Sequence, residues 1–577
     1  MEKQLLLGNE AVARGLYEAG CRVVSSYPGT PSTEITQHAS EYDEIYCEWA
    51  PNEKVAVEVS VGASIGGARA FSSMKHVGLN VAADPVFTAS YTGVNGGLVI
   101  AVADDPGMHS SQNEQDSRHY AISAKLPMLE PADSAECLEF TKLAFSMSEE
   151  YDTPVLIRLT TRISHSRSLA VTSQRIDAPL KDYIKDMRKY VMMPAMAIGR
   201  HTIVEQRMLK LTDLSENISL NKIEDNKAKI GVITAGISYQ QAKEALGDNA
   251  SYLKLGMINP MPVKLIKDFA EKFEKVYVIE ELDGIIETHC KINGINVSGK
   301  ELFGYEGEIS ANIIREKILL KTPEIKAFTE VTPNRPPVMC PGCPHRGTFY
   351  VLNKLKLNVI GDIGCYTLGA LPPLSAIDVV ICMGSGVSAL HGINIARGKE
   401  FAKKTVGVLG DSTFIHSGIT GLIDISYNNG ISTVLVLDNS TTGMTGQQNN
   451  PTTGYTIKNE PSEKVDLESL ARACGFNRVK TVDPRDLALT ERVISEELEA
   501  EEPSLIIVRR PCALLKTVKH NPAADIDSDK CTGCKMCMKV GCPAISMKNK
   551  KAVINKSQCV GCTVCSQLCK FNAIKEA

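Results

Sequence analysis

Short apolar runs alternate with helical patterns in the first part of the chain. Residues 10–19 and 55–70 have the apolar spacing of helices, and the segment CRVVSSYPGTPS is predicted to be a strand that leads into a loop and a helix start. Strand-like runs follow at residues 97–103 (GLVIAVA) and 153–159 (TPVLIRL). Because strands that alternate with helices are typical of a parallel sheet, residues 1–175 are predicted to form an α/β domain.

The rest of the chain divides into a connecting region and three further domains. Residues 176–228 show no clear motif, whereas the runs KIGVITAG, SYLKLGMI and KVYVIEE predict a second α/β domain over residues 229–325. A third α/β domain is expected over residues 335–517, and a polar linker then leads to a cysteine-rich tail, residues 525–577. The predicted fold class is therefore α/β, with several parallel-sheet domains and a small α+β domain at the C-terminus.

The third domain contains a pattern that is typical of phosphate binding. The apolar run VGVLG predicts a buried strand that ends at the turn GDS, where a helix begins, and a second run, TVLVL, ends on an aspartate and an asparagine. Carboxylate, amide and backbone oxygens are ligands that suit Mg²⁺ when a bound diphosphate supplies the others. The candidates for holding a diphosphate and its metal ion are Gly410, Asp411, Ser412, Asn439 and Thr441.

Composition and charge narrow the class of protein. A chain of 577 residues with 43% hydrophobic content is long enough for several domains that each bury a core. Its net charge of −4 and the absence of a basic block in the sequence argue against a nucleic-acid partner. The sequence has no signal peptide and no 18-residue apolar span, so we expect a soluble, cytoplasmic protein.

The cysteine-rich tail has the spacing of two iron–sulfur clusters. Two C-x2-C-x2-C runs are each followed by a fourth cysteine, and in such pairs of runs the fourth cysteine binds the other cluster. Zinc is the alternative, although structural zinc sites do not need this repeated triplet. We assign one [4Fe-4S] cluster to Cys531, Cys534, Cys537 and Cys569, and the other to Cys559, Cys562, Cys565 and Cys542.

Two details of the tail depart from the usual ferredoxin pattern. Four residues, instead of three, separate Cys537 from Cys542, and Lys570 follows Cys569 at a position where proline is common. Neither departure removes a ligand. A domain that holds two clusters and little else carries electrons, so the bond chemistry is expected upstream of it.

The motifs upstream of the tail resemble a known family. MCPGCPHRGTFY, GDIGCYTLG, ICMGSGVSALHGINIARG and the GDS…DN stretch resemble the diphosphate-type domain of the thiamine-diphosphate-dependent 2-oxoacid:ferredoxin oxidoreductases. YPGTPSTE and NEKVAVEVSVGASIGGARA resemble their pyrimidine-type domain, and residues 229–325 would be their transketolase C-terminal-like domain. Domain order, the segment MKHVGLNVAADP and the fused tail are most similar to the α subunits of members that act on arylpyruvates such as indolepyruvate.

The resemblance implies catalytic roles for residues of the first domain. Glu53 lies nine residues before Gly62 in a helical run, as the family glutamate that bonds the aminopyrimidine ring of thiamine does. Glu48 and Glu58 are the nearby alternatives, since most helix glutamates only face solvent. Thr30, in YPGTPS, is the candidate hydroxyl donor to the substrate, although the segment also fits a proline-rich turn before an N-cap serine.

Four further features have both a functional and a structural interpretation. Arg118 is a candidate for binding the substrate carboxylate, with Arg346 as a second choice, and either arginine also fits an ordinary salt bridge. His416, just after GDS, is a candidate for assisting the diphosphate or the substrate, or else packs locally. The strand expected over DVVICM is followed by G-x-G, a weak motif whose backbone N–H groups suit phosphate: Gly384, Ser385 and Gly386.

The remaining cysteines suggest a third cluster. The family carries a [4Fe-4S] cluster near thiamine on four cysteines in a similar order, and a one-electron acceptor beside the reacting carbon would suit oxidation by single electrons. The alternative is that these are buried thiols. The proposed ligands are Cys340, Cys343, Cys365 and Cys512, whereas Cys21, Cys47, Cys137, Cys290, Cys382 and Cys474 have no partner spacing and are interpreted as core thiols.

The resemblance implies an oxygen-sensitive enzyme that oxidatively decarboxylates an arylpyruvate with coenzyme A. The products would be an aryl-acyl-CoA, CO₂ and reduced ferredoxin. The family's γ-type domain has no counterpart in the chain, so a separate β subunit and an α2β2 assembly are expected. Two rival hypotheses are a non-oxidative thiamine decarboxylase, for which the tail cysteines would have no use, and an electron-transfer subunit whose thiamine site has decayed, which Glu53, Asp411 and Asn439 argue against.

Overall fold

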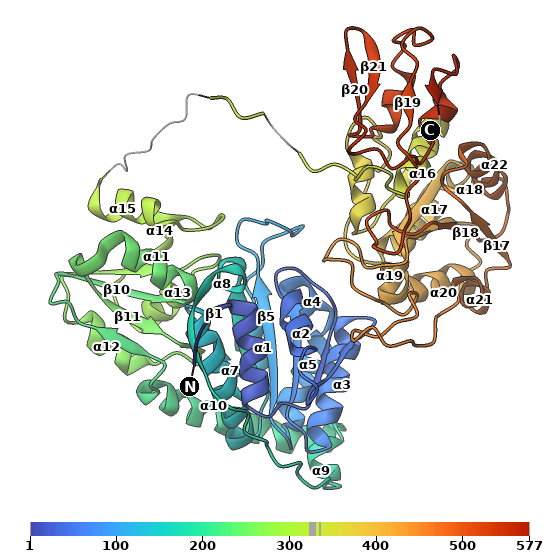
Figure 1. Cartoon of the computed structure of the whole chain (residues 1–577). Helices are drawn as coiled ribbons and strands as arrows, with labels where there is room; N and C mark the ends of the chain where they lie inside the picture. Colours follow the sequence, from blue (N-terminus) through green and yellow to red (C-terminus); the bar gives the residue numbers. More distant parts are fainter. Residues whose placement is uncertain (1, 322–329, 334–335, 576–577) are drawn as a thin grey trace. The chain divides into compact units, whose positions relative to one another are not determined.

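The computed structural model describes residues 2–321, 330–333 and 336–575. The chain divides into two units, Met1–Thr329 and Glu330–Ala577, which are described separately here (Figure 1). The expected end of the second domain at residue 325 and the expected start of the third at 335 lie outside the described residues.

A seven-stranded sheet is the centre of the first unit. Its strand order is β12-β6-β7-β5-β4-β2-β3, and only the β12–β6 pair is antiparallel. The predicted strands at residues 97–103 and 153–159 correspond to β5 and β7. The strands are β2 (Val23–Ser26), β3 (Tyr46–Trp49), β4 (Ala70–Lys75), β5 (Leu98–Asp104), β6 (Met128–Leu129), β7 (Val155–Thr160) and β12 (Met257–Asn259).

Helices cover the faces of this sheet, and α1 packs along α7 (Figure 1). A two-stranded antiparallel ribbon, β1 (Glu2–Leu7) with β8 (Arg167–Thr172), joins the two ends of the first domain. The helices are α1 (Gly8–Glu18), α2 (Thr33–Ala39), α3 (Glu53–Ile65), α4 (His76–Val81), α5 (Ala83–Thr92), α6 (Arg118–Ala124), α7 (Ser134–Tyr151), α8 (Thr161–His165), α9 (Met187–Tyr190) and α10 (Pro194–Asn217).

The connecting region is more regular than the sequence pattern suggests. It contains the long helix α10, whose Arg200 and Arg207 are buried against the first domain: Arg200 donates to the carbonyl of Tyr91 at 2.5 Å, and Arg207 donates to that of Ser90 at 2.7 Å. The helix contacts its neighbour through these buried arginines as well as through apolar side chains, which explains why an apolar periodicity is hard to see in its sequence.

The second domain is a four-stranded sheet of order β13-β10-β11-β9. Its three longer strands are parallel and correspond to the predicted runs, and β9 is antiparallel. The run SYLKLGMI divides into β11 and β12, and β12 joins the sheet of the first domain. The elements are β9 (Lys222–Glu224), β10 (Ile230–Ala235), β11 (Ala250–Leu255), β13 (Lys275–Ile279), α11 (Gly236–Leu246), α12 (Val263–Ala270), α13 (Ile285–Ile292), α14 (Lys300–Phe303) and α15 (Ala311–Leu319).

A buried ion-pair network joins these two domains at Arg118. Arg118 donates to Asp116 from Nη2 at 2.6 Å and to Glu280 of the second domain from Nη1 at 2.6 Å. Nη2 also donates to the carbonyls of Glu281 and Asp283. Burial alone raises the pKa of Asp116, but Arg118 and Arg158 outweigh it and hold that pKa well below its usual range.

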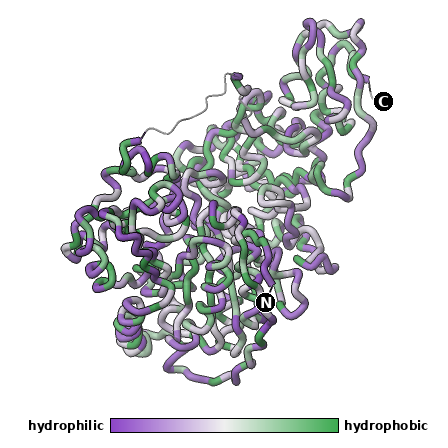
Figure 2. Tube along the Cα trace, turned by 60° about the vertical axis from the view of Figure 1, so that its left-hand side comes forward, coloured by the Kyte–Doolittle hydropathy of each residue, from purple (hydrophilic) through white to green (hydrophobic). Residues whose placement is uncertain are grey.

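The second unit contains a five-stranded, fully parallel sheet of order β14-β15-β16-β18-β17. The interior strands β15, β16 and β18 are largely apolar and almost wholly buried, and Figure 2 shows how hydrophobic and hydrophilic positions are distributed along the chain. Its elements are β14 (Asn358–Ile360), β15 (Thr405–Gly410), β16 (Thr433–Asp438), β17 (Arg478–Val482), β18 (Ser504–Arg509), α16 (His345–Leu355), α17 (Ser385–Arg397), α18 (Lys399–Ala402), α19 (Asp411–Thr413), α20 (Ile419–Tyr427), α21 (Leu467–Ala473) and α22 (Leu487–Leu498).

The expected strand DVVICM does not form. Only Val379 makes an isolated bridge to Ile360, where its carbonyl accepts from Gly361 at 2.8 Å. Beyond it the chain turns towards α17 and leaves Cys382 exposed, so the prediction of a core thiol is wrong for Cys382. The other five cysteines interpreted as core thiols are buried, as predicted: Cys21, Cys47, Cys137, Cys290 and Cys474.

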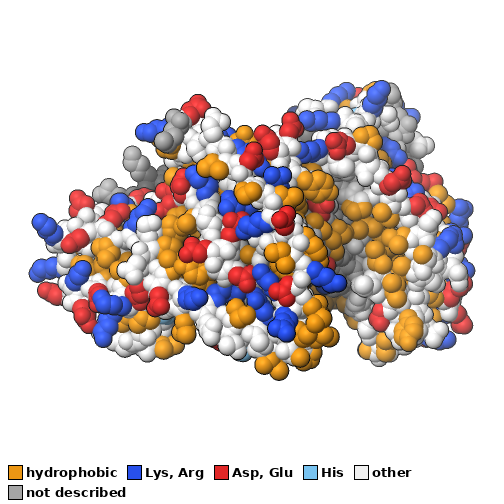
Figure 3. Space-filling model, turned by 90° about the horizontal axis from the view of Figure 1, so that it is seen from below, with side chains coloured by type: hydrophobic (Ala, Val, Ile, Leu, Met, Phe, Trp, Pro, Cys, Tyr) orange, Lys and Arg blue, Asp and Glu red, His pale blue; other side chains and the backbone are white. Residues whose placement is uncertain are grey.

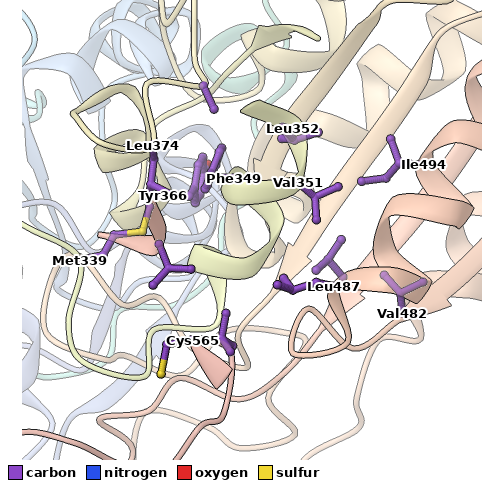
Figure 4. Packing of buried hydrophobic residues seen from close by; sticks show 14 of the residues in the cluster. Met339, Phe349, Val351, Leu352, Tyr366, Leu374, Val482, Leu487, Ile494 and Cys565 are labelled. Atoms are coloured by element: carbon purple, nitrogen blue, oxygen red, sulfur yellow. The ribbon is translucent and has the colours of Figure 1, made fainter. Parts of the chain in front are cut away.

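The tail packs on the parallel-sheet domain of the second unit through one shared core. Phe349, Val351 and Leu352 of α16 and Leu487 of α22 belong to the same apolar cluster as Cys565 of the tail (Figure 4). The tail itself consists of short antiparallel pairs, β19 (Asp525–Ile526) with β22 (Ile574–Lys575) and β20 (Ile545–Lys548) with β21 (Lys551–Ile554).

Acidic and basic side chains are interspersed on the face drawn in Figure 3, in keeping with a net charge of only −4. In the part of the chain that the structure describes, none of the helices combines the length and the apolar character needed to cross a bilayer.

Replacing Arg118 by Met should lower the free energy of unfolding of the first unit by about 3–5 kcal/mol, because Asp116 and Glu280 would remain buried without their cation. The matched control is Arg162→Met, which removes an arginine whose side chain is 57% exposed in its pair with Glu308 and should cost about 1 kcal/mol or less. Denaturant unfolding of both variants measures the two costs, and equal losses would refute the structural role of Arg118.

Candidate active site

The ends of two neighbouring parallel strands bring the predicted diphosphate residues together. β15 ends at Gly410 and β16 ends at Asp438, and these strands pair directly, with Gly410 opposite Leu437. Asp411 and Asn439, the residues that follow each strand, are both buried. The spacing of the two strands thus places an acid and an amide at one edge of the sheet, as the sequence pattern predicts.

Asp411 is a buried carboxyl to which no cationic side chain of the described residues is bonded. Thr452 donates to its Oδ2 at 3.0 Å, whereas the nearby Asp438 is bonded by Arg509 at 2.8 Å. Burial, and then the charge of Asp438, raise the pKa of Asp411 to about 7. A divalent cation would supply the missing positive charge and bind the ionised carboxylate, so the donor set at this edge fits Mg²⁺.

Asn439 is held from three directions. Its Oδ1 accepts from the Thr441 N–H at 3.2 Å, and its own carbonyl accepts from the Cys512 N–H at 2.9 Å. Its Nδ2 lies 3.3 Å from Nε2 of His345, and burial lowers the pKa of His345 to about 4. A neutral His345 accepts from the amide, and Oδ1, which accepts one bond from Thr441, keeps a second lone pair that could bind a metal ion. His345 is a positioning residue that the sequence motifs did not single out.

Four cysteines distant in sequence gather beside Asn439. Burial raises the pKa of Cys343, and the nearby thiols of Cys340 and Cys365 raise it further. Burial also raises the pKa of Cys365, with contributions from the thiols of Cys512 and Cys340. A Cβ on Gly443 would lie 3.4 Å from Sγ of Cys365 and 3.6 Å from Nδ2 of Asn439. The four thiols suggested for a third cluster therefore form one group, next to the proposed metal ligand.

A backbone N–H group of the G-x-G motif is already hydrogen-bonded within the protein. Asp362, directly after β14, accepts from the Gly386 N–H at 2.9 Å, and burial raises the pKa of Asp362 to about 6. Ser385 bonds the backbone of Cys382 through its hydroxyl. His416 is buried, with Nδ1 2.5 Å from Oγ of Ser417. Asp362 was missed by motif reasoning because an aspartate after a short strand has many roles.

The tail cysteines form the two sets that the spacing predicts. Burial raises the pKa of Cys537, and the thiols of Cys531, Cys534 and Cys569 raise it further. Burial likewise raises the pKa of Cys565 to about 12, with contributions from Cys562, Cys542 and Cys559 and a smaller one from Cys537 of the other set. Each fourth cysteine, Cys569 or Cys542, thus lies near the triplet of the other run.

In the described residues, no three His, Cys, Asp or Glu side chains converge in the way that one metal ion requires. A cluster of four irons occupies the space between its thiolates, so its ligands lie around a volume and not around a point.

Glu53 differs clearly from its two alternatives in the first domain. It is the first residue of α3, after the N-cap Asn52, and it is 5% exposed. A Cβ on Gly78 would lie 2.7 Å from its Oε1, so only glycine leaves room for this carboxyl. Glu48 bonds Ser25 at 2.7 Å and Tyr46 at 2.8 Å near the surface, and Glu58 makes an exposed pair with Lys54.

Thr30 lies in a loop near a buried lysine. The carbonyl of Thr30 accepts from Oγ of Ser110 at 3.3 Å, and Lys75 donates to the carbonyl of Ser110 at 2.6 Å. Burial lowers the pKa of Lys75 to about 8. His76 is buried beside it, and burial lowers its pKa as well. Lys75 and His76 lie in the segment MKHVG, whose sequence indicated only the family and no role for either residue.

The two candidate arginines are engaged elsewhere. All three guanidinium nitrogens of Arg118 already donate hydrogen bonds, and two carboxylates neutralise its charge, so the structure corrects its expected role and assigns it to the domain junction. Arg346 donates to the carbonyls of Met339, Cys340 and Val540. The Arg118 guanidinium is thus fully bonded, and both terminal nitrogens of Arg346 are bonded to backbone carbonyls.

Three family models match the chain. "Pyruvate flavodoxin/ferredoxin oxidoreductase, thiamine diP-bdg" matches residues 14–229. "Thiamine pyrophosphate enzyme, C-terminal TPP binding domain" matches residues 362–508, and "4Fe-4S dicluster domain" matches residues 523–570. The matched ranges contain Glu53, the Asp411–Asn439 edge and the eight tail cysteines, respectively.

Full-length relatives have the same organisation. The chain is 40% identical to "Indolepyruvate oxidoreductase subunit IorA" of Pyrococcus abyssi, over all of this chain and 97% of the relative. It is 38% identical to the protein of that name from Archaeoglobus fulgidus, over all of this chain and 98% of the relative. Among solved structures, a 2-oxoglutarate:ferredoxin oxidoreductase from Magnetococcus marinus aligns with 17% identity and a TM-score of 0.48, over 55% of this chain and 65% of its own.

These matches confirm the resemblance in the sequence, including the α/β class with parallel-sheet thiamine domains and a dicluster tail. The chain belongs to the family of the indolepyruvate oxidoreductase IorA subunits and is a thiamine-diphosphate-dependent 2-oxoacid:ferredoxin oxidoreductase with iron–sulfur electron transfer.

Proposed function

We propose that the enzyme oxidises arylpyruvates, of the indolepyruvate and phenylpyruvate type, with coenzyme A to an aryl-acyl-CoA and CO₂. The electrons pass through three clusters to ferredoxin. The observation that carries this proposal is the group of four thiols beside Asn439, because it would place an electron acceptor next to the bound cofactor. The names of the relatives support the choice of substrate.

Thiamine diphosphate supplies the nucleophilic carbon and the electron sink. The chain would hold its diphosphate through Mg²⁺ bound to Asp411, Asn439 and a carbonyl near Thr441, with Gly384, Ser385, Gly386, Gly410 and Ser412 around it. The buried carboxyl of Glu53 would hold a proton at the aminopyrimidine ring, where burial keeps water from competing for the bond.

The residues that would meet the substrate are Thr30 and His416. The Thr30 hydroxyl is offered by a partly buried loop of the first domain, and His416 is buried beside the G-x-G turn of the second unit. A hydroxyl donor and an imidazole are groups that can orient a 2-oxoacid and move a proton at its oxygen.

The third cluster would be bound by Cys340, Cys343, Cys365 and Cys512. Three observations support it: the effect of neighbouring thiols on the pKa values of Cys343, Cys365 and Cys512, the partial burial of all four side chains, and the bond from the Cys512 N–H to the Asn439 carbonyl. Unrelated thiols would not need to converge from three separate segments of the chain.

We further infer that the chain works with a separate β subunit of the γ type in a cytoplasmic α2β2 assembly. The relatives carry the word subunit in their names, which supports a partner of this kind. Coenzyme A and ferredoxin would be the soluble partners, and the dicluster tail offers the route to ferredoxin.

Replacing Glu53 by Gln should lower the rate of viologen reduction about 100-fold or more, because the amide cannot hold the proton that the carboxyl holds. An anaerobic assay with indolepyruvate, pyruvate, 2-oxoglutarate, CoA and the partner subunit measures this rate. Thiamine diphosphate should remain bound, and Glu58→Gln should be unchanged because Glu58 is exposed. Unimpaired turnover in the Glu53 variant would show that Glu53 does not hold the proton at the aminopyrimidine ring. Aldehyde formation without dye reduction by the unmodified enzyme would instead favour a non-oxidative decarboxylase.

The iron content should be about 12 atoms per chain, and Cys512→Ser should lower it to about 8. Colorimetric iron analysis of anaerobically purified protein measures both values. Cys474→Ser is the matched control, since Cys474 is a buried thiol outside the three groups, and it should leave the count unchanged. About 8 irons in the unmodified chain would exclude the third cluster.

Mg²⁺ affinity in the presence of thiamine diphosphate should rise with pH up to about 7 and level off above it. Asp411, with its pKa raised to about 7, holds a proton in the folded, metal-free protein that Mg²⁺ must displace. For the same reason the metal-free chain should lose stability as pH rises from about 4 to about 7, because the unfolded carboxyl releases that proton earlier. Calorimetric titration at pH 5.5 to 8 should show a slope of about tenfold per pH unit below 7 that Asp411→Asn abolishes. An unchanged slope in the variant would show that another group titrates.

A further inference from the structure

Arg346 is a buried arginine at the start of α16, three residues after Cys343. It is 3% exposed. Its Nη2 donates to the carbonyls of Met339 at 2.6 Å and Cys340 at 3.0 Å, and its Nη1 donates to the carbonyl of Val540 at 2.7 Å. One guanidinium therefore bonds the loop of the proposed third cluster and the tail segment that leads to Cys542.

No carboxylate compensates this charge. Among the residues that the structure describes, Arg346 has no acidic partner, and its buried Nε has no hydrogen-bond acceptor. A buried cation without a counter-charge is costly, so native structures nearly always pair one. Arg158 of the first unit shows the usual arrangement, with Asp104 and Glu130 bonded to it.

The thiols on either side of Arg346 belong to two different cluster sites. Its charge lowers the pKa values of both Cys343 and Cys542, against the larger effect of burial, which raises them. The loops that carry these sites also pack directly on each other: a Cβ on Gly342 would lie 2.1 Å from Cγ2 of Val560, in the Cys559–Cys562 loop. Arg346 thus lies at the junction where an electron would cross from the thiamine domain to the tail.

We propose that Arg346 is a positioning residue whose counter-charge is the negative charge of the iron–sulfur clusters. It holds the Cys340–Cys343 loop against the tail and raises the reduction potential of the cluster bound by Cys542, Cys559, Cys562 and Cys565. The half of this proposal that concerns a cluster on Cys340 and Cys343 rests on the proposed function. The half that concerns the tail cluster does not.

The sign of the effect follows from electrostatics. A cluster with four thiolate ligands gains one negative charge on reduction, and a nearby buried cation stabilises the reduced form more than the oxidised form. The Cys531 cluster should be less affected, because Arg346 and its loop adjoin the other site at two places: a Cβ on Gly541, next to Cys542, would lie 3.4 Å from Nη1 of Arg346, and Gly342 packs on Val560, next to Cys559. The two tail clusters therefore provide a comparison within one molecule.

The test is an EPR-monitored redox titration of the anaerobically purified full chain. Arg346→Met should shift the reduction equilibrium of one tail cluster at least about tenfold towards the oxidised form, a fall of about 59 mV for a one-electron couple. Arg346→Lys keeps the charge and should recover more than half of that shift. Lys354→Met, which removes an exposed cation from the same helix, should change neither potential.

Three outcomes overturn the proposal. Unchanged potentials in Arg346→Met with full iron content would show that the charge has no effect. Equal shifts in the Met and Lys variants would mean that lost hydrogen bonds, and not charge, are the cause. Loss of iron from both variants would show that Arg346 has only a structural role. Loss of iron from Arg346→Met alone, with near-normal potentials in Arg346→Lys, would support the proposal. A count of about 8 irons in the unmodified chain would refute the third cluster but leave the tail measurement valid.

Discussion

The parallel pairing of β15 with β16 is the constraint on which the rest of the site depends. Because their carboxyl ends lie at one sheet edge, Asp411 and Asn439 become neighbours. The His345 and Cys512 bonds then attach the cysteine loops to the same edge. The proposed cofactor site and the proposed third cluster thus share one set of backbone positions.

Much of the architecture could be predicted because its signals are local. The apolar runs for β5, β7, β10, β15 and β16 end within a residue or two of the observed strands, and the cysteine triplets identify the tail from spacing alone. Helix α10 was not predicted, because its buried face includes arginines. The DVVICM run does not form a strand because its pairing with β14 stops after Asp378 and Val379, which leaves only an isolated bridge.

The site was predicted less completely because its remaining partners are distant in sequence. Nothing near Arg118 in the chain shows that Glu280, 162 residues away, neutralises it. His345, Asp362 and Lys75 were likewise overlooked, since burial gives each its character and a single sequence does not display burial. Glu53 was distinguishable from Glu48 and Glu58 only through its motif, and the structure now separates them by exposure.

The core shared by the tail and the parallel-sheet domain has a thermodynamic consequence. Leu487 and Ile494 of α22 and Phe349 of α16 are buried in the same cluster as tail residues such as Val540 and Ile545 (Figure 4). The two parts therefore form one cooperative unit and not a catalyst with a tethered carrier. Oxidative loss of iron from the tail would therefore loosen the packing beneath the sheet edge that carries Asp411 and Asn439. Damage to the clusters would then also disturb the proposed cofactor site.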